Sequence, residues 1–178
     1  GWYRICSKIL GHSECNLIQV PIYMQFKLVL NDTFDKYNCG EFDKKENDTI
    51  SVSKSNFSHE TDEVNVMISD TYPLSLSQLP EIKKNIPTLL ISRNNTNDVN
   101  RYDSPELVRC VVNEVRSLNN NIKKVNVYAT TNPLNTKNIA SSAFKLGGRD
   151  NFNEVRVFQQ ERDGIRKFNN KGIVVYKR

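Results

Sequence analysis

The sequence has little of what usually identifies an enzyme or a membrane protein. No apolar run approaches the roughly 20 residues that a membrane helix needs, and no signal-type apolar segment follows the N-terminus. There is no C-x-x-C pair, P-loop, G-x-G-x-x-G motif or nucleophile elbow, and the only histidines are His12 and His59. These absences argue against a membrane span, a zinc ribbon, a P-loop nucleotidase and a Ser/His/Asp hydrolase.

The size and composition are those of a globular domain. The chain has 178 residues, of which 38% are hydrophobic and 25% charged. A chain of this length usually forms one domain and can bury a core without disulfides or metals. We therefore expect a single α/β domain over residues 1–178, in which residues 1–16 could form an N-terminal appendage.

The net charge of +5 conceals an uneven distribution. Residues 1–89 hold 9 basic and 12 acidic residues, whereas residues 90–178 hold 16 basic and 8 acidic residues. A basic half attracts phosphate groups, either those of a nucleotide cofactor or those of a nucleic acid backbone. A mixed, solvated surface is the alternative, because acidic residues are interspersed throughout.

The cysteines leave the redox compartment open. They are Cys6, Cys15, Cys39 and Cys110. They could form disulfides in a secreted protein or remain thiols in the cytoplasm, the compartment we expect. Glycosylation sequons begin at Asn31, Asn47, Asn56 and Asn94, a number close to chance in so asparagine-rich a chain. Cys6, His12 and Cys15 lack the spacing of a zinc site, so we expect no metal.

The sequence predicts mainly strands in the first half of the chain. Alternating apolar residues predict a strand over residues 17–30, and shorter strands are predicted over 50–53 and 64–69. Residues 74–86 suggest a helix broken at Pro80. Residues 1–16 could contribute a short helix with Trp2, Ile5, Ile9 and Leu10 on one face.

The second half alternates strands and helices. The apolar run TLLIS (88–92) predicts a central strand, and Ser104 and Pro105 predict the start of a helix that ends near residues 119–121. A strand over 122–131 and a helix from Asn135 to Leu146 follow, the latter stopped by two glycines. Strands over 154–160 and 172–178 close the chain as an antiparallel pair. The expected fold is a mixed central sheet with the order β-β-β-(α)-β-α-β-α-β-β.

This order resembles the GNAT acyltransferase superfamily. TLLIS with the loop and helix after it is similar to that family's central strand and acyl-CoA pyrophosphate loop. The strand over 122–131 matches the next strand, and NTKNIASSAFKLGG (135–148) matches the capped helix that follows. The resemblance covers residues 87–178. It implies a GNAT-like fold, acetyl-CoA or another acyl-CoA as cofactor, and transfer of an acyl group to an amine.

The resemblance also implies roles for individual residues. The strand backbone would align the pantetheine, two arginines would neutralise phosphates, and the helix starts would supply donors and a cap. The implied cofactor-binding residues are Leu90, Ile91, Ser92, Arg93, Arg101, Ser104 and Asn135. Ala143 stands where the family usually has its acid tyrosine. Independently of the resemblance, Tyr128, on the predicted strand between the two helices, could donate a proton at a cleft. A packed core tyrosine is the alternative reading of Tyr128.

Two further functions stay open at this point. Residues 145–178 contain nine basic residues interleaved with Phe158, Phe168 and Tyr176. Such a segment could bind RNA without catalysis, as in a ribonucleoprotein component. The sequons and cysteines would instead suit a mainly-β secreted or virion surface domain.

Overall fold

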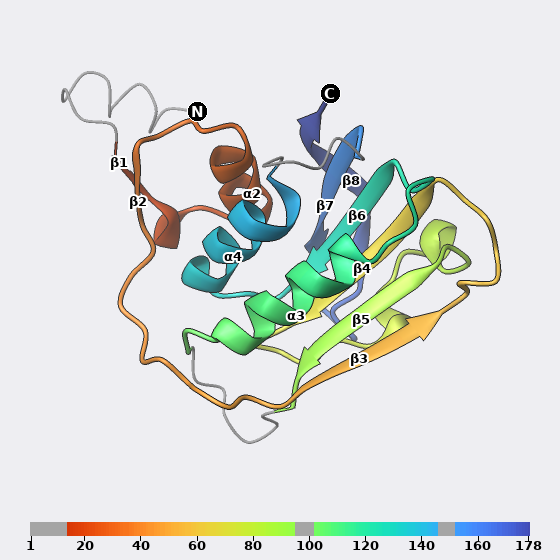
Figure 1. Cartoon of the computed structure of the whole chain (residues 1–178), viewed down its shortest axis with the longest axis horizontal. Helices are drawn as coiled ribbons and strands as arrows, with labels where there is room; N and C mark the ends of the chain where they lie inside the picture. Colours follow the sequence, from red (N-terminus) through yellow and green to blue (C-terminus); the bar gives the residue numbers. More distant parts are fainter. Residues whose placement is uncertain (1–13, 95–101, 146–151) are drawn as a thin grey trace.

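A mixed six-stranded sheet forms the centre of the molecule (Figure 1). The computed structural model describes residues 14–94, 102–145 and 152–178. The strands are β3 (Ile50–Ser55), β4 (Glu63–Ser69), β5 (Thr88–Arg93), β6 (Lys124–Ala129), β7 (Glu154–Gln160) and β8 (Phe168–Lys177), in the order β3-β5-β4-β6-β7-β8. The four inner strands run parallel, and β3 and β8 pair antiparallel at the two edges.

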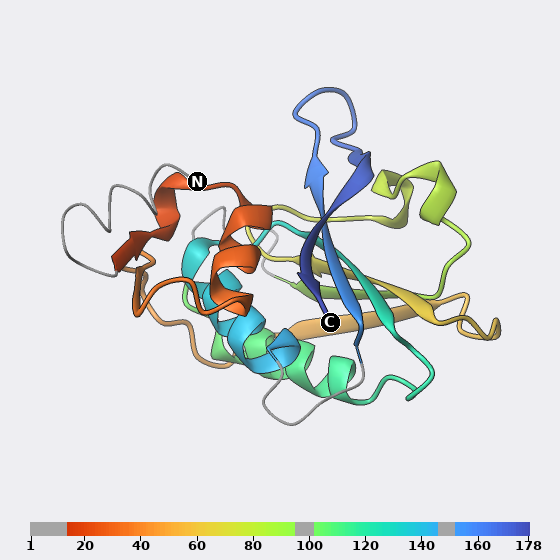
Figure 2. The same ribbon diagram turned by 90° about the horizontal axis from the view of Figure 1, so that it is seen from above.

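Three helices cover one face of this sheet (Figure 2). They are α2 (Ile22–Leu30), α3 (Pro105–Arg116) and α4 (Pro133–Ile139), and a π-helical turn (Ala140–Phe144) extends α4. The stripe of α3 that contains Leu107, Val111 and Val115 is fully buried in the larger core cluster. Period-3.6 apolar spacing therefore places α3 on the sheet, as amphipathic helices require.

The opposite face is covered by the connection from β4 to β5. This connection contains two 3-10 helices, η2 (Leu76–Gln78) and η3 (Glu81–Lys83). Its Leu74 and Leu79 form a second core cluster with Tyr128 and Phe158. The chain thus leaves β4 toward one face of the sheet, whereas it leaves β6 through α4 toward the other.

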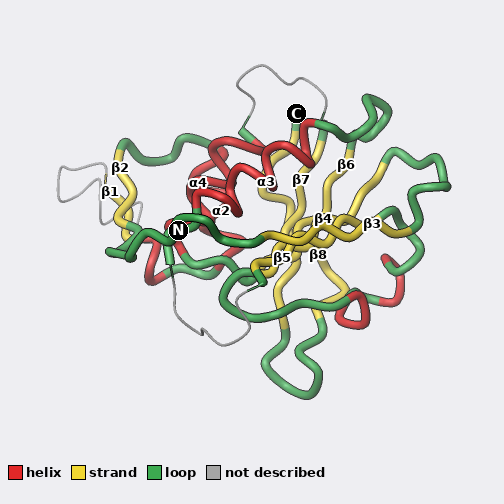
Figure 3. Tube along the Cα trace, turned by 60° about the horizontal axis from the view of Figure 1, so that its bottom comes forward, coloured by secondary structure: helices red, strands yellow, loops and turns green. Residues whose placement is uncertain are grey.

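A small parallel pair, β1 (Glu14–Asn16) and β2 (Lys36–Asn38), lies beyond the helices, away from the main sheet (Figure 3). It lies beside the 3-10 helix η1 (Leu17–Gln19). Cys15 and Cys39 are buried there as free thiols, and Cys110 on α3 is free as well. Burial raises the pKa of Cys15 and Cys39, which keeps both thiols protonated.

The strand predicted over residues 17–30 is wrong. The segment forms η1 and α2, and Pro21 stands just before the first helical residue. The segment Ile22–Leu30 is apolar on nearly every side, so its apparent alternation does not define a period. Because α2 packs against both β8 and α4, burial on several sides selects the helix.

The GNAT resemblance implies a slot between two neighbouring parallel strands near residues 90 and 126, and this expectation is also wrong. Strand β4 lies between β5 and β6 and pairs with both. A GNAT-like slot between β5 and β6 therefore does not exist. Asn135 is not the cap of its helix either, since α4 begins at Pro133 and Asn132 caps it by accepting from the backbone N–H of Asn135 at 2.8 Å.

Most other predicted elements are confirmed. The mixed α/β sheet, the Ser104 cap, the parallel inner strands and the antiparallel final pair are all present. The broken helix over 74–86 is resolved as η2 and η3 on either side of Pro80. The predictions for Trp2, Ile5, Ile9 and Leu10, for Cys6 and His12, for Arg101 and for 146–148 lie outside the described residues.

Within the described ranges, no helix combines the length and the apolar character that crossing a bilayer requires.

Candidate functional site

A pocket of about 290 Å³ opens where the parallel strands end. Its lining comes from the segments that follow β4 and β6, from the end of β7, and from the start of α2. Because the chain leaves β4 and β6 toward opposite faces, a crevice forms between their carboxyl ends. Open α/β sheets bind ligands at such switch points. The polar lining residues are Gln25, Thr71, Tyr72, Thr130, Thr131, Asn132, Gln159, Gln160, Arg162 and Arg166.

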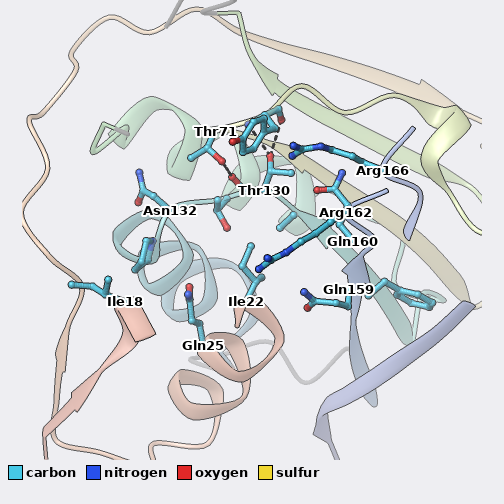
Figure 4. Close-up of a pocket in the computed structure, with 15 residues that line it drawn as sticks. Ile18, Ile22, Gln25, Thr71, Thr130, Asn132, Gln159, Gln160, Arg162 and Arg166 are labelled. Carbon is cyan, nitrogen blue, oxygen red and sulfur yellow. Dashed lines mark hydrogen bonds between the residues drawn. The ribbon is translucent and has the colours of Figure 1, made fainter. Parts of the chain in front are cut away.

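Hydrogen bonds fasten the wall between β4 and β6. Both the backbone N–H and the hydroxyl of Thr71 donate to the carbonyl oxygen of Thr130, at 3.0 and 2.6 Å. The Thr130 hydroxyl in turn donates to the Tyr72 carbonyl at 2.8 Å (Figure 4). Two loops that are 58 to 60 residues apart in sequence are thus joined into one rigid wall.

Two arginines bring positive charge to the pocket. Arg162 and Arg166 point toward it from the hairpin between β7 and β8 (Figure 4). The Arg166 guanidinium lies 4.6 Å from the centre of the Tyr72 ring, a cation–π contact. Gln78 donates to the Ile165 carbonyl at 3.0 Å and so ties the hairpin to η2.

Nothing in the described lining opposes this charge. The pocket-lining residues that the structure describes include no Asp or Glu. The first turn of α2 opens at the pocket with Ile22 and carries no acidic residue, so the positive end of the helix dipole is not neutralised there. The pocket is therefore suited to an anionic ligand.

A buried ionic network lies beneath the pocket wall. The guanidinium of Arg93 contacts Asp48 at 2.9 Å and Asp70 at 2.7 Å, and all three side chains are at most 2% exposed. Ser104 donates to Asp48 at 2.7 Å, and the Asn135 amide donates to Asp70 at 2.9 Å. Asn135 also accepts from the backbone N–H of Ser104 at 3.1 Å. The network joins β5, α3 and α4 to the ends of β4 and β6.

The Asp70 carboxylate connects this network to the pocket lining. Asp70 accepts from the backbone N–H of Asn132, a lining residue, at 3.1 Å. Burial opposes the charge on Arg93, but the hydrogen bond and attraction from Asp70, together with Asp48, outweigh it and raise the pKa of Arg93. Arg93 is thus a permanent buried cation that holds the wall in place.

The structure brings three of the sequence-predicted residues together, although not around a ligand. Arg93, Ser104 and Asn135 all belong to the buried network. The Arg93 side chain is 2% exposed and Ser104 and Asn135 are fully buried, so none presents its side chain to the pocket. Their side chains bond instead to Asp48 and Asp70, and the Asn135 side chain also accepts from the Ser104 backbone N–H. Arg101 lies outside the described residues.

The strand residues occupy other places. Leu90, Ile91 and Ser92 lie within β5, whose two edges are already paired with β3 and β4. No backbone edge of β5 is left there to align a pantetheine as an added strand. Tyr128 is fully buried, stacked 4.7 Å from Phe158, and its hydroxyl donates to Asn65. Burial also raises the pKa of Tyr128, which fits the packed core alternative and does not fit a proton donor.

Sequence reasoning missed the organising residues of the site. Asp70 and Asn132 stand just after the apolar strands β4 and β6, a position where polar residues often mark a binding site. That signal was present in the sequence. Gln25 lies inside the segment predicted as a strand, and Asp48 lies outside every predicted element.

Solved structures show where this fold occurs. The chain is similar to the Cap4 SAVED/CARF-domain-containing receptor of Acinetobacter baumannii with the cyclic trinucleotide 2′3′3′-cAAA, at a TM-score of 0.61 and 11% identity over 88% of this chain. The same receptor with 3′3′3′-cAAA matches at a TM-score of 0.58 and 12% identity, again over 88% of this chain. A third Cap4 structure matches at a TM-score of 0.55 and 11% identity over 92% of this chain. This chain spans 35 to 37% of the length of those Cap4 chains.

These findings overturn the acyltransferase prediction. The sheet matches a SAVED/CARF receptor instead of a GNAT enzyme, and the ligands in the matching structures are cyclic trinucleotides instead of acyl-CoA. The predicted acyl transfer and the acetyl-CoA cofactor are therefore wrong. Neither an RNA-binding domain nor a secreted or virion surface domain gains support from the comparisons.

The family of the chain is established by sequence. A search of curated proteins found no match. The family model of the SMODS- and Ubiquitin system-associated 2TM effector domain matches residues 1–175. The chain therefore belongs to the SMODS- and Ubiquitin system-associated 2TM (SUa-2TM) effector domain family.

Proposed function

We propose that this domain is the sensor of a SMODS-associated effector and that it binds a cyclic oligonucleotide in the pocket at the ends of β4, β6 and β7. One observation carries the proposal. This chain shares its fold with a receptor whose structures contain cyclic trinucleotides, and its own cationic pocket lies at the switch point of the sheet.

The chemistry of the lining suits such a ligand. A cyclic oligonucleotide carries one negative phosphate per nucleotide, and Arg162 and Arg166 offer planar donors that bind phosphate in a bidentate manner. The start of α2 contributes the positive end of its dipole.

The size of the pocket sets how the ligand lies. A volume of about 290 Å³ is at the lower end of the range of small-molecule pockets, roughly 300–1,000 Å³. The pocket therefore accommodates one nucleotide of the ring at a time. The remaining nucleotides would lie over the β7–β8 hairpin, where the two arginines are placed.

The test is a calorimetric titration with 2′3′3′-cAAA and 3′3′3′-cAAA. Arg162→Ala and Arg166→Ala each remove a charged hydrogen-bond donor, so each should weaken binding by about 10- to 100-fold and reduce its salt dependence. Arg109→Ala is the matched control, because Arg109 is exposed on α3 and pairs with Glu106. Its affinity should equal that of the wild type.

Two results would contradict the proposal. The first is that neither these ligands nor other cyclic di- and trinucleotides bind the wild-type chain. The second is that they bind but that the two pocket variants behave like Arg109→Ala.

A further inference from the structure

The pocket contains an acceptor whose orientation is fixed. Gln25 on α2 is 4% exposed, and its Nε2 donates to the carbonyls of Leu17 at 3.2 Å and Val20 at 2.9 Å. Because both partners are carbonyl oxygens, the amide cannot turn over without losing both bonds. Its Oε1 atom is buried and has no hydrogen-bond partner among the described residues.

A second amide lines the same pocket from the sheet. Gln160, at the end of β7, has a buried Nε2 atom that also finds no acceptor in the described part of the chain. Figure 4 shows Gln25 rising from α2 and Gln160 placed across the pocket from it. Gln25 and Gln160 thus supply one unused acceptor and one unused donor at one site.

Unused buried polar atoms call for an explanation. Buried amide groups in folded proteins almost always have partners, and the structure leaves only three such side-chain atoms over the described ranges. Two of the three line this pocket, and the third belongs to Arg93 in the network beneath it. The pattern is that of a site whose partners arrive with a ligand.

The donor–acceptor pattern identifies the edge of a base. Glutamine pairs with adenine because the amino group of adenine donates while an adjacent ring nitrogen accepts. Guanine and hypoxanthine present an oxygen in place of that amino group, and this oxygen would face the fixed Oε1 of Gln25 with no proton between them. Cytosine shares the adenine pattern, but the trinucleotides of the Cap4 structures are adenine-only rings.

We propose that Gln25 and Gln160 read the amino edge of an adenine, Gln25 Oε1 accepting from the amino group and Gln160 donating to a ring nitrogen. This inference rests on the proposed function, and it adds which base enters the pocket and which residues select it. Selectivity resides in Gln25 in particular, since its acceptor cannot rotate into a donor.

The experiment compares two ligands that differ at the amino group. Affinities are measured for 3′3′3′-cAAA and for its all-inosine counterpart, on the wild type and on Gln25→Met, Gln160→Met and Gln19→Met. The wild type should prefer the adenine ring by about tenfold or more. Gln25→Met should bring this ratio close to one, whereas Gln160→Met, which keeps the Gln25 acceptor, should lower it in part. Gln19→Met should keep the ratio, because Gln19 is an exposed glutamine of η1 outside the pocket lining.

The ratio separates selection from a purely structural role. If Gln25 only fastened Leu17 and Val20, its substitution would weaken both ligands equally and leave the ratio unchanged, which would overturn the inference. Should Gln25→Met not fold, Gln160→Met decides alone. Equal wild-type affinity for both rings would refute base selection while leaving the proposed function intact. Binding of neither ring would refute the inference, and it would refute the proposed function as well only if the other cyclic di- and trinucleotides also failed to bind.

Discussion

Replacing Asp70 by asparagine should destabilise the domain strongly, because the Asp70 carboxylate connects the buried ionic network to the pocket wall. Its side chain is 0% exposed and accepts from Arg93 at 2.7 Å, from the Asn132 backbone at 3.1 Å and from Asn135 at 2.9 Å. In Asp70→Asn the negative charge disappears, and the new amide group points its protons at one of these donors.

The loss of stability can be estimated from the partner that Arg93 keeps in Asp70→Asn. Leaving a buried charge without its partner costs about 3–5 kcal/mol. Arg93 keeps Asp48 at 2.9 Å, so we expect the lower end, about 3 kcal/mol. In a domain of this size, 1 kcal/mol shifts Tm by about 2–4 °C, so the loss should lower Tm by about 6–12 °C.

Urea denaturation followed by circular dichroism measures this loss. Asp62→Asn is the matched control, since Asp62 is an exposed residue before β4 and its substitution should change stability by less than about 0.5 kcal/mol. If Asp70→Asn lay within 1 kcal/mol of the wild type, the buried pair would not hold the wall, and the reasoning would be refuted.

Two further predictions concern the sheet. A Cβ added at Gly172 would lie 2.7 Å from the ring of Phe158, which is held by stacking in the second core cluster, so Gly172→Ala should cost about 1–3 kcal/mol in a denaturation experiment. A cost near zero would mean that the ring moves freely. Burial tends to raise the pKa of Glu63, but hydrogen bonds from Lys83 and Asn126 outweigh it and lower that pKa. The ionised form is thus favoured by folding, and stability should fall as the pH drops below the unfolded value of about 4.3. Glu63→Gln should reduce this loss of stability at acid pH. An unchanged dependence of stability on pH would contradict the role given to Glu63.

Local sequence signals predict those elements that contain their own capping residues and apolar periodicity. Ser104 and Pro105 mark the start of α3, and its apolar stripe predicts the buried face that the structure shows. The segment 17–30 has no such signal beyond Pro21. Its secondary structure depends on α4 and β8, which pack against it from distant parts of the chain. Strand order is non-local for the same reason. Nothing near residues 90 or 126 indicates that β4 separates β5 from β6.

The site residues also divide into local signals, which the sequence shows, and distant partners, which it does not. The resemblance implies that Arg93, Ser104 and Asn135 bind the cofactor, but their side chains bond to protein groups instead. The partners of Arg93 stand 45 and 23 residues away in the sequence, at Asp48 and Asp70. A basic residue that is free to bind phosphate and one that is buried in an ion pair look alike in sequence.

Hydrogen–deuterium exchange with and without 3′3′3′-cAAA tests the central claim most directly. Bound ligand should slow exchange in residues 70–73, 129–133 and 158–166, which surround the pocket, and should leave 57–61 and 117–122 unchanged at the opposite end of the sheet. Protection confined to that opposite end, or no protection at saturating ligand, would contradict the account.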